Sequence, residues 1–556
     1  MLIPHVFVPS GEGIDPLLPP PPAADASGGV PAPAPAPAPA PTPAPTPTLQ
    51  FIDKVSVLGP VIVEVESGQS DEHVKEIMGK VIAKTNANNL RPCYLEGLDM
   101  DQDVLATALL DAGLHGVFFK LPTLGADTDL MIELSVFKRV LQNFPRARVG
   151  VVATISTGLA ATVATDGGKQ LHDYLINIVS ANRGAAVHFY FQFQQEPLPT
   201  LAHAQHHAQQ QQQQYSVQQR ALDQVVDTCK ALVEKTTSAH DNIQVYVGLP
   251  RECHGSSKTA TKVATAASDN TIHAVFKARP LTRSGSSSGG SGMMGAVDSS
   301  SADEGIDVLS AFIACARSDR PDGLYTTVVC DQHGVCLGLV YSNDVSICAA
   351  VFEKKGIYWS RSRGGLWRKG DSSGMHQELL SIDLDCDGDA LRFTVIQHGT
   401  PASFCHLMTR TCWGDVHGFQ HLQSILQARL VSAPPGSYTK RLFTDEDLLM
   451  KKLVEEAQEL AEAKTHDEVA GEAADLMYFL MTRCVAAGVS LKDIENKLDY
   501  RSLKVTRRPG NAKDYRTEVA AALLPQSAKL QAAVAAAAPP APAPAPAPVA
   551  AAAPKP

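Results

Sequence analysis

The 556-residue sequence has no apolar run of about 20 residues, so no segment is expected to cross a membrane as a helix. Its first 15 residues hold no lysine or arginine and lack the long apolar stretch of a secretory signal. Neither a secretory signal nor a transit peptide is therefore expected. We predict a cytoplasmic protein that does not bind membranes.

A disulfide framework is also absent, because the 11 cysteines are odd in number and spread along the chain. This usage indicates a reducing compartment in which some thiols are free to bind metal. The chain also has no excess of positive charge: it contains 48 lysines and arginines and 58 acidic residues, which gives a net charge of −10. An acidic chain is not expected to bind nucleic acid, although local basic clusters can still hold phosphate.

Low-complexity tracts divide the chain. Runs of Pro/Ala or Gly/Ser cannot bury a core, so they predict extended or disordered spacers, as does the His/Gln-rich run at 203–214. We expect a leader and Pro/Ala linker at 1–49, an α/β domain at 50–280, a flexible linker at 281–305, a second domain at 306–428, a helical domain at 434–515 and a disordered Ala/Pro tail at 516–556.

The segment 50–280 alternates helical stretches with continuous β-branched or aromatic runs. This pattern is typical of an α/β fold with a parallel sheet or a barrel. It contains no Gly-rich phosphate loop, and Cys253-His254 is an isolated pair, so we expect a structural or regulatory role. The strand-like runs are Val55–Val65, Val117–Lys120, Val149–Ile155, Ala186–Phe193, Ile243–Leu249 and Ala274–Ala278, and the helical stretches include Asp127–Asn143 and Val217–Lys235.

The next segment has a different character. Tyr325–Val329 and Cys336–Tyr341 predict paired strands, and a basic, Gly-rich loop with two tryptophans follows them. Such a loop is a candidate phosphate cradle, the alternative being an exposed charged hairpin. Its candidate substrate-binding residues are Arg361, Arg363, Arg368, Lys369, Ser372 and Ser373.

Carboxylates and thiols come next. Asp385, Asp387 and Asp389 alternate, so on an extended strand they would share one face and favour Mg²⁺; a Ca²⁺-type loop or a solvated turn is the alternative. Cys386 lies between them, and Cys405 and Cys412 follow. Three thiols suffice for a catalytic zinc that keeps one position open for water, the alternative being three free cysteines in a core.

These motifs, in the order RPDGLYTTVV, CLGLVYSN, YWSRSR, LWRKGDSSG, DCDGDAL, FCH and TC, resemble the phosphoribosyl-AMP cyclohydrolase family over Arg320 to Gly414. The resemblance implies an α+β domain that opens the adenine ring between N1 and C6. It implies zinc on Cys386, Cys405 and Cys412, shared across a homodimer interface, and Mg²⁺ on the three aspartates. Relatives carry a histidine directly after the Ser-Gly of the loop; here Met375 intervenes, and His376 is the candidate acid or base.

Residues 434–510 carry helical spacing throughout. Glu455, Glu456 and Glu459 share one helix face, and Glu472 and Asp475 lie three residues apart on the next helix. An antiparallel pair of these helices would gather the carboxylates, for which Mg²⁺ is the suitable counter-ion. An ordinary acidic helix surface is the alternative, but Glu472 and Asp475 interrupt an apolar run, which favours a buried metal cage.

This acidic pattern, with SYTKRLF, EAADLMYFL and LKVTRRPG, resembles phosphoribosyl-ATP pyrophosphohydrolase. The resemblance implies an all-α domain in which water attacks between the α- and β-phosphates of an ATP-derived substrate. The carboxylates would be catalytic, with Glu456, Glu459, Glu472 and Asp475 as metal ligands. Candidate phosphate contacts are Lys452, Lys504, Arg507 and Arg508.

The domain order resembles the front part of the fungal-type trifunctional histidine-biosynthesis proteins, without their histidinol dehydrogenase module. We therefore expect a bifunctional hydrolase that converts phosphoribosyl-ATP to phosphoribosyl-AMP and then opens its ring. The alternatives are a general NTP pyrophosphohydrolase with an inactive cyclohydrolase domain and a non-catalytic zinc-binding scaffold.

Overall fold

The computed structural model describes residues 2–8, 47–66, 68–87, 91–121, 130–194, 219–233, 243–249, 272–279 and 306–506. These residues form two compact units: the first holds an α/β barrel, a central domain and the segment from Glu495 on, and the second, His417–Ile494, is helical. The Pro/Ala tracts, the 281–305 linker, the 203–214 run and Cys253-His254 lie outside the described residues.

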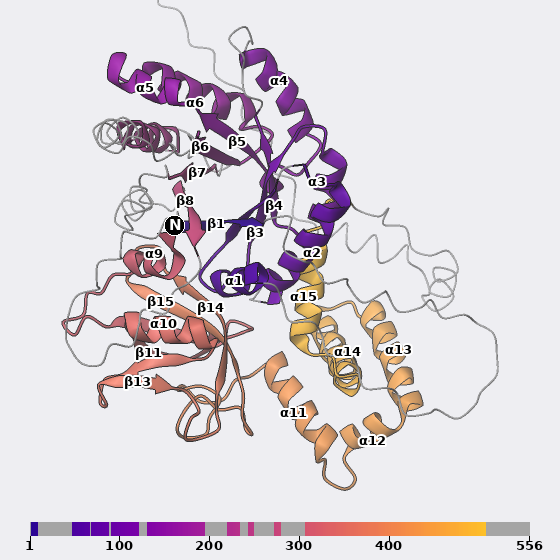
Figure 1. Cartoon of the computed structure of the whole chain (residues 1–556). Helices are drawn as coiled ribbons and strands as arrows, with labels where there is room; N and C mark the ends of the chain where they lie inside the picture. Colours follow the sequence, from indigo (N-terminus) through magenta and orange to yellow (C-terminus); the bar gives the residue numbers. More distant parts are fainter. Residues whose placement is uncertain are drawn as a thin grey trace, which may run out of the picture. The chain divides into compact units, whose positions relative to one another are not determined.

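The predicted α/β region is a closed barrel of eight parallel strands, because β1 pairs with both β2 and β8 (Figure 1). The strands are β1 (Leu2–Val8), β2 (Val61–Val65), β3 (Cys93–Leu98), β4 (Gly116–Lys120), β5 (Val149–Ile155), β6 (His188–Phe193), β7 (Gln244–Gly248) and β8 (Ile272–Arg279). The helices are α1 (Pro47–Val55), α2 (Asp71–Ala87), α3 (Asp103–Asp111), α4 (Leu130–Leu141), α5 (Thr157–Thr165), α6 (Lys169–Asn182) and residues 219–233, with a 3₁₀ turn at Arg146–Arg148.

Successive side chains along each strand point to opposite faces of the barrel sheet, and both faces are buried. Side chains of one parity fill the inside of the barrel, as Phe118, Tyr190 and Tyr246 do. Those of the other parity, such as Val63 and Phe119, join the outer core beneath the helices. The apolar strands predicted from the sequence are thus covered on both faces, as in other α/β barrels.

Two sequence predictions in this region were wrong. The segment predicted as a leader contributes β1, whose Ile3, Val6 and Val8 are buried. A long connection costs little extra loop entropy, so the Pro/Ala tract does not prevent β1 from closing the barrel. The strand predicted at Val55–Val65 is shorter, because α1 ends at Val55 and Gly59-Pro60 interrupts the run before β2.

The central domain is α+β, as predicted. Its four-stranded sheet has the order β11-β10-β15-β14, and a separate hairpin pairs β12 with β13. Helices α9 and α10 accompany the sheet (Figure 1). The elements are β9 (Ile306–Asp307), α9 (Val308–Cys315), β10 (Tyr325–Asp331), β11 (Cys336–Ser342), α10 (Asp344–Glu353), β12 (Ile357–Ser360), β13 (Gly365–Arg368), β14 (Gln377–Leu384) and β15 (Ala390–Gln397).

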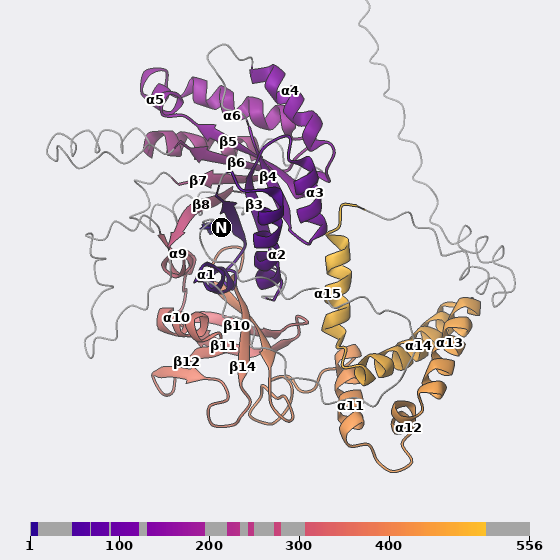
Figure 2. The same cartoon turned by 45° about the vertical axis from the view of Figure 1, so that its right-hand side comes forward.

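The helical unit begins earlier than the boundary predicted at 428–434, because α11 packs with it through the buried Leu426. Side-chain caps start its helices: Asp445 accepts from Leu448, and Thr465 forms a capping box with Glu468. Helices α13 and α14 lie side by side in both views (Figures 1 and 2). The helices are α11 (Phe419–Val431), α12 (Tyr438–Thr444), α13 (Glu446–Glu462) and α14 (His466–Ala486). Helix α15 (Leu491–Ser502) follows, but from Glu495 on it belongs to the first unit and not to the helical domain predicted at 434–515.

Among the described residues no single helix has the length and apolar character needed to cross a membrane. Only α14 and α15 counted together pass that test, and they are bent by 101°.

Candidate active sites

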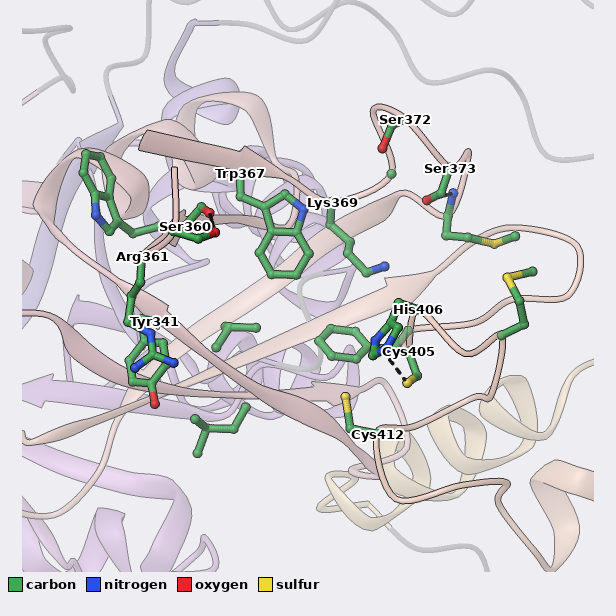
Figure 3. Close-up of a pocket in the computed structure, with 18 residues that line it drawn as sticks. Tyr341, Ser360, Arg361, Trp367, Lys369, Ser372, Ser373, Cys405, His406 and Cys412 are labelled. Carbon is green, nitrogen blue, oxygen red and sulfur yellow. Dashed lines mark hydrogen bonds between the residues drawn. The ribbon is translucent and has the colours of Figure 1, made fainter. Parts of the chain in front are cut away.

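A cavity of about 860 Å³ opens in the central domain beside β11 and the β12–β13 hairpin (Figure 3). The hairpin pairs Trp359 with Leu366, and its next residues bring Lys369 over the Phe404 ring, with Nζ 5.2 Å from the centroid. Partial burial lowers the pKa of Lys369. The wall therefore combines aromatic faces with positive charge, a combination suited to a purine and a phosphate.

The structure separates the predicted phosphate-binding residues. Four of the six line this cavity: Arg361, Lys369, Ser372 and Ser373. Arg368 does not, because its guanidinium makes two hydrogen bonds to Glu353, at 2.7 and 3.1 Å. Arg363 is exposed and also lies outside the cavity lining. The six cations and hydroxyls are close in sequence, but the hairpin turns them to different sides.

Two of the three predicted thiol ligands meet at the floor of the cavity. Figure 3 shows the sulfur atoms of Cys405 and Cys412 next to each other below Lys369. The backbone N–H of Leu407 donates to Cys405 Sγ at 3.5 Å and lowers the pKa of that thiol. Partial burial raises the pKa of Cys412, and the neighbouring Cys405 adds to the effect. Two adjacent thiols form a soft donor pair of the kind that zinc prefers.

Cys386 is exposed and does not line the cavity. It shares no close donor group with Cys405 and Cys412 among the described residues. A single chain therefore offers two of the three thiols at the cavity. His406, whose Nδ1 lies 3.9 Å from Cys405 Sγ, offers a nearby nitrogen ligand that was not predicted from the sequence.

A buried carboxylate supports the loop that carries the two thiols. Asp331, at the end of β10, has no exposed side-chain surface and accepts from Arg410 at 3.0 Å. It also accepts from the backbone N–H groups of His333 and Val335, at 3.0 Å each. Gly338 makes room for the loop, since a Cβ there would lie 2.3 Å from Phe404 and 3.0 Å from Cys412 Sγ.

The three aspartates come together, but by a turn and not by the strand alternation that was predicted. Asp385, Asp387 and Asp389 follow the end of β14, where Gly388 has a φ of +81°. Oxygen atoms from all three lie within 4.8 Å of one another. Asp387, foremost among the neighbouring charges, raises the pKa of Asp389. Hard oxygen donors at this spacing fit a divalent cation.

His376 does not line the cavity. Its exposed ring stacks on His398, with centroids 4.6 Å apart and planes inclined by 12°. The wall instead contains Tyr341, which the sequence analysis did not select. The guanidinium carbons of Arg361 and Arg320 lie 4.1 and 4.4 Å from its ring centroid. A tyrosine within a strand motif gives no sign in the sequence that two distant arginines will stack on it.

The second predicted site forms between α13 and α14. Glu455, Glu456 and Glu459 make one close group, and Glu456 also forms a close group with Glu472 and Asp475. Glu456 is the shared member, and its side chain is only 6% exposed. Desolvation and the charges of Glu456 and Glu472 raise the pKa of Glu459. The two helices thus bring the predicted carboxylates into two overlapping groups, but the predicted burial is wrong: Glu456 is buried, Glu472 is half-buried, and the other three are exposed.

Lys452 neutralises part of this charge. Its Nζ lies 2.7 Å from Glu456 and 2.9 Å from Glu455, and these hydrogen bonds raise the pKa of the lysine. The predicted phosphate contact is thus held by carboxylates in this structure. Lys504 is exposed after α15, and Arg507 and Arg508 lie outside the described residues.

Together the described residues form two candidate metal centres in one chain, a pair of thiols in a basic aromatic cavity and a cluster of carboxylates between two helices. The family models of phosphoribosyl-AMP cyclohydrolase and phosphoribosyl-ATP pyrophosphohydrolase match residues 338–414 and 419–502. A histidine biosynthesis bifunctional protein HisIE from Shewanella oneidensis is 35% identical over 198 residues, which are 34% of this chain and 92% of that protein. The chain belongs to the family of these bifunctional histidine-biosynthesis proteins, both of whose domains are metal-dependent in general.

Fungal relatives are more similar but longer. The histidine biosynthesis trifunctional protein of Kluyveromyces lactis is 58% identical over 198 residues, 35% of this chain and 25% of that protein. The histidine biosynthesis bifunctional protein his7 of Schizosaccharomyces pombe is 49% identical over 208 residues, 37% of this chain and 49% of that protein. The matched part of the chain thus spans about a quarter of the trifunctional relatives.

Proposed function

We propose that this chain catalyses two consecutive hydrolyses in histidine biosynthesis. The helical domain would cleave phosphoribosyl-ATP to phosphoribosyl-AMP and pyrophosphate, and the central domain would open the adenine ring of the product. The observation that carries the proposal is the coexistence of both sites in one chain: paired thiols in a basic aromatic cavity and five carboxylates between two helices.

Different cavity residues would bind the purine and the phosphate of phosphoribosyl-AMP. Trp367 offers a flat face against which a purine can stack. Arg361, Ser372 and Ser373 offer charge-assisted and hydroxyl hydrogen bonds to a phosphate. Lys369 extends between these walls and the thiols, so it can stabilise negative charge that develops on the ring during hydrolysis.

The donor set of Cys405 and Cys412 fits zinc, which when bound would activate a water molecule for attack on the purine. A third thiol is needed for the ligand set that the family resemblance implies. We propose that Cys386 of a second copy supplies it in a homodimer. The exposed apolar side chains of Leu407, Met408 and Trp413 beside the two thiols support an interface at this edge. The turn of Asp385, Asp387 and Asp389 would hold Mg²⁺.

In the helical domain the carboxylates would hold Mg²⁺ against the phosphate chain. Glu456, Glu472 and Asp475 come from both helices and lie close enough together to bind a common ion. Lys452 already sits on Glu455 and Glu456 and would be available to a phosphate once a cation takes its place. We propose that these groups orient the attacking water and neutralise the pyrophosphate leaving group.

A substitution in the thiol pair tests the cyclohydrolase half. Cys405→Ser is expected to lower ring opening of phosphoribosyl-AMP by more than about 100-fold, since a ligand costs at least as much as its supporting partners. Pyrophosphate release from phosphoribosyl-ATP should be unchanged. Cys348→Ser, a cysteine on α10 away from the cavity lining, is the matched control. If Cys405→Ser opens the ring as fast as the wild type, the assignment of zinc to the two thiols is wrong.

A further inference from the structure

The barrel contacts the central domain at the strand that leads into the acidic turn. Strand β14 is the edge of its four-stranded sheet, and Asp385 follows its last residue. Edge strands expose backbone groups that need partners. Here the N–H of Ile382 donates to the carbonyl of Val57, a barrel residue, at 2.8 Å. The barrel therefore covers part of the open edge of β14.

A barrel arginine completes this contact. Arg91 donates to Asp383 Oδ1 and, through Nη2, to the carbonyls of Val57 and Ile382 at 3.1 and 3.2 Å. Its side chain is only 12% exposed. Arg392 of the central domain binds the other carboxylate oxygen, Asp383 Oδ2, at 3.1 Å. The Asp383 carboxylate is thus held by one arginine from each domain.

The two barrel residues in this contact, Arg91 and Val57, each make a backbone hydrogen bond within the barrel. The backbone N–H of Arg91 donates to the carbonyl of Thr85, a buried residue of α2, at 3.0 Å. Val57 follows α1 with a fully buried side chain, and its N–H donates to Lys54 at 3.3 Å. The Arg91 guanidinium and the Val57 carbonyl therefore bind β14 from residues whose own backbone is hydrogen-bonded within the barrel.

We propose that Arg91 is a positioning residue for the cyclohydrolase site, through which the barrel fixes the end of β14 and the aspartate turn behind it. This inference rests on the proposed function, in which that turn holds Mg²⁺. The HisIE relative is matched over 92% of its length by 34% of this chain, which leaves it no room for such a barrel. The barrel is then a support added in this chain to a domain that others use without it.

The geometry of the aspartate turn depends on the position of the end of β14. Asp385 Oδ1 accepts from the N–H groups of Gly388 and Ala390, at 2.9 and 3.1 Å, so its carboxylate sets the shape of the turn. Asp385 lies two residues after Asp383. A shift of the strand end would therefore move one oxygen donor relative to the other two and weaken a site whose ligands must converge.

Arg91→Ala in the full-length chain tests the inference. The Mg²⁺ concentration that half-protects the peptide 377–390 against hydrogen exchange should rise about tenfold, the lower end of the effect of removing a partner behind a metal ligand. Arg91→Lys, which keeps the charge but not the forked donor, should recover part of the loss. The matched control is Asp53→Asn, which removes another ion pair between barrel and central domain, Lys354–Asp53 at 3.1 Å, and should leave the half-protecting concentration unchanged.

Equal half-protecting concentrations in Arg91→Ala and the wild type would overturn the inference. Should Arg91→Ala fail to fold, Asp383→Asn removes the ion pair with Arg91, together with that to Arg392, at little change in volume; it must show a larger rise than Arg392→Ala, or the inference is wrong. Ring opening distinguishes this failure from that of the proposed function. If the wild-type chain does not open the ring, the proposed cyclohydrolase activity is wrong. If the wild type opens the ring but Arg91→Ala has the wild-type half-protecting Mg²⁺ concentration, only the proposed role of Arg91 is wrong.

Discussion

At the scale of single residues, buried charge supports the thiol site. Asp331 has no exposed side-chain surface, yet it binds Arg410 and two backbone N–H groups that shape the adjoining turn. A buried carboxylate is tolerated only when its partners compensate for its lost hydration. Asp331 therefore connects the fold of β10 to the loop of Cys405 and Cys412.

Asp331→Asn is expected to destabilise the central domain by about 3 kcal/mol, because Arg410 would lose a charged partner that is shielded from water. Urea unfolding followed by tryptophan fluorescence reports on this domain, since all three tryptophans of the chain lie in it: Trp359, Trp367 and Trp413. Asp322→Asn removes an exposed ion pair with Arg320 and should leave the transition in place. Identical transitions for Asp331→Asn and the wild type would contradict this role.

Residue types and spacing predicted several groups of side chains that lie together in the structure. The thiols, the aspartates and the five helical carboxylates were predicted from the sequence, and Cys405, Cys412 and the carboxylates do come together. Spacing could not show which way a side chain turns, so Arg368 was predicted for phosphate although Glu353 binds it. Nor could spacing reveal Tyr341 or Arg91, whose partners are far away in the sequence.

At the scale of elements, the antiparallel pair of α13 and α14 builds the carboxylate cage. The capping box of Thr465 and Glu468 starts α14 soon after α13 ends, so the two helices turn back on each other. Glu456 on one helix then meets Glu472 and Asp475 on the other. The sequence predicted this pairing because helical periodicity and a short break determine it locally.

Glu472→Gln is expected to lower pyrophosphate release on the order of 100-fold, since it removes one charge from a group that must hold a cation against phosphate. Ring opening of supplied phosphoribosyl-AMP should remain normal. Glu462→Gln, at the end of α13 and outside both close groups, serves as the control. Full pyrophosphate release by Glu472→Gln, measured with a coupled phosphate assay, would show that the cage is not the site.

Elements whose partners are distant in the sequence were harder to predict. The strand β1 was assigned to a leader, because nothing within Leu2–Val8 shows that β8, some 270 residues later, will pair with it. The aspartate turn was predicted as a strand because alternation is the pattern of a strand face, whereas Gly388 makes a tight connection between β14 and β15. Local composition predicted these elements only where local contacts determine them.

At the scale of the whole molecule, domains of two families that are metal-dependent in general share one chain with a barrel. The donor types of the two sites differ: thiols in the central cavity and carboxylates between the helices. Soft and hard donors select different cations. The two activities should therefore respond differently to metal removal and replacement.

Prolonged chelation is expected to abolish both activities. Added Mg²⁺ alone should restore pyrophosphate release, because carboxylates and phosphate suit a hard cation. It should not restore ring opening, which needs zinc in the thiol site. Metal content before and after chelation, measured by mass spectrometry, should show the loss of zinc. Recovery of ring opening with Mg²⁺ in zinc-free protein would contradict the assignment of the thiols.

The central claim is that one chain performs both hydrolyses in sequence. The most direct measurement supplies the full-length protein with phosphoribosyl-ATP, zinc and Mg²⁺, and follows pyrophosphate and the absorbance of the ring-opened product in the same sample. The account predicts prompt pyrophosphate release, followed after a lag by the absorbance change as phosphoribosyl-AMP accumulates and is consumed. Pyrophosphate release without any ring opening, or no reaction of phosphoribosyl-ATP at all, would contradict it.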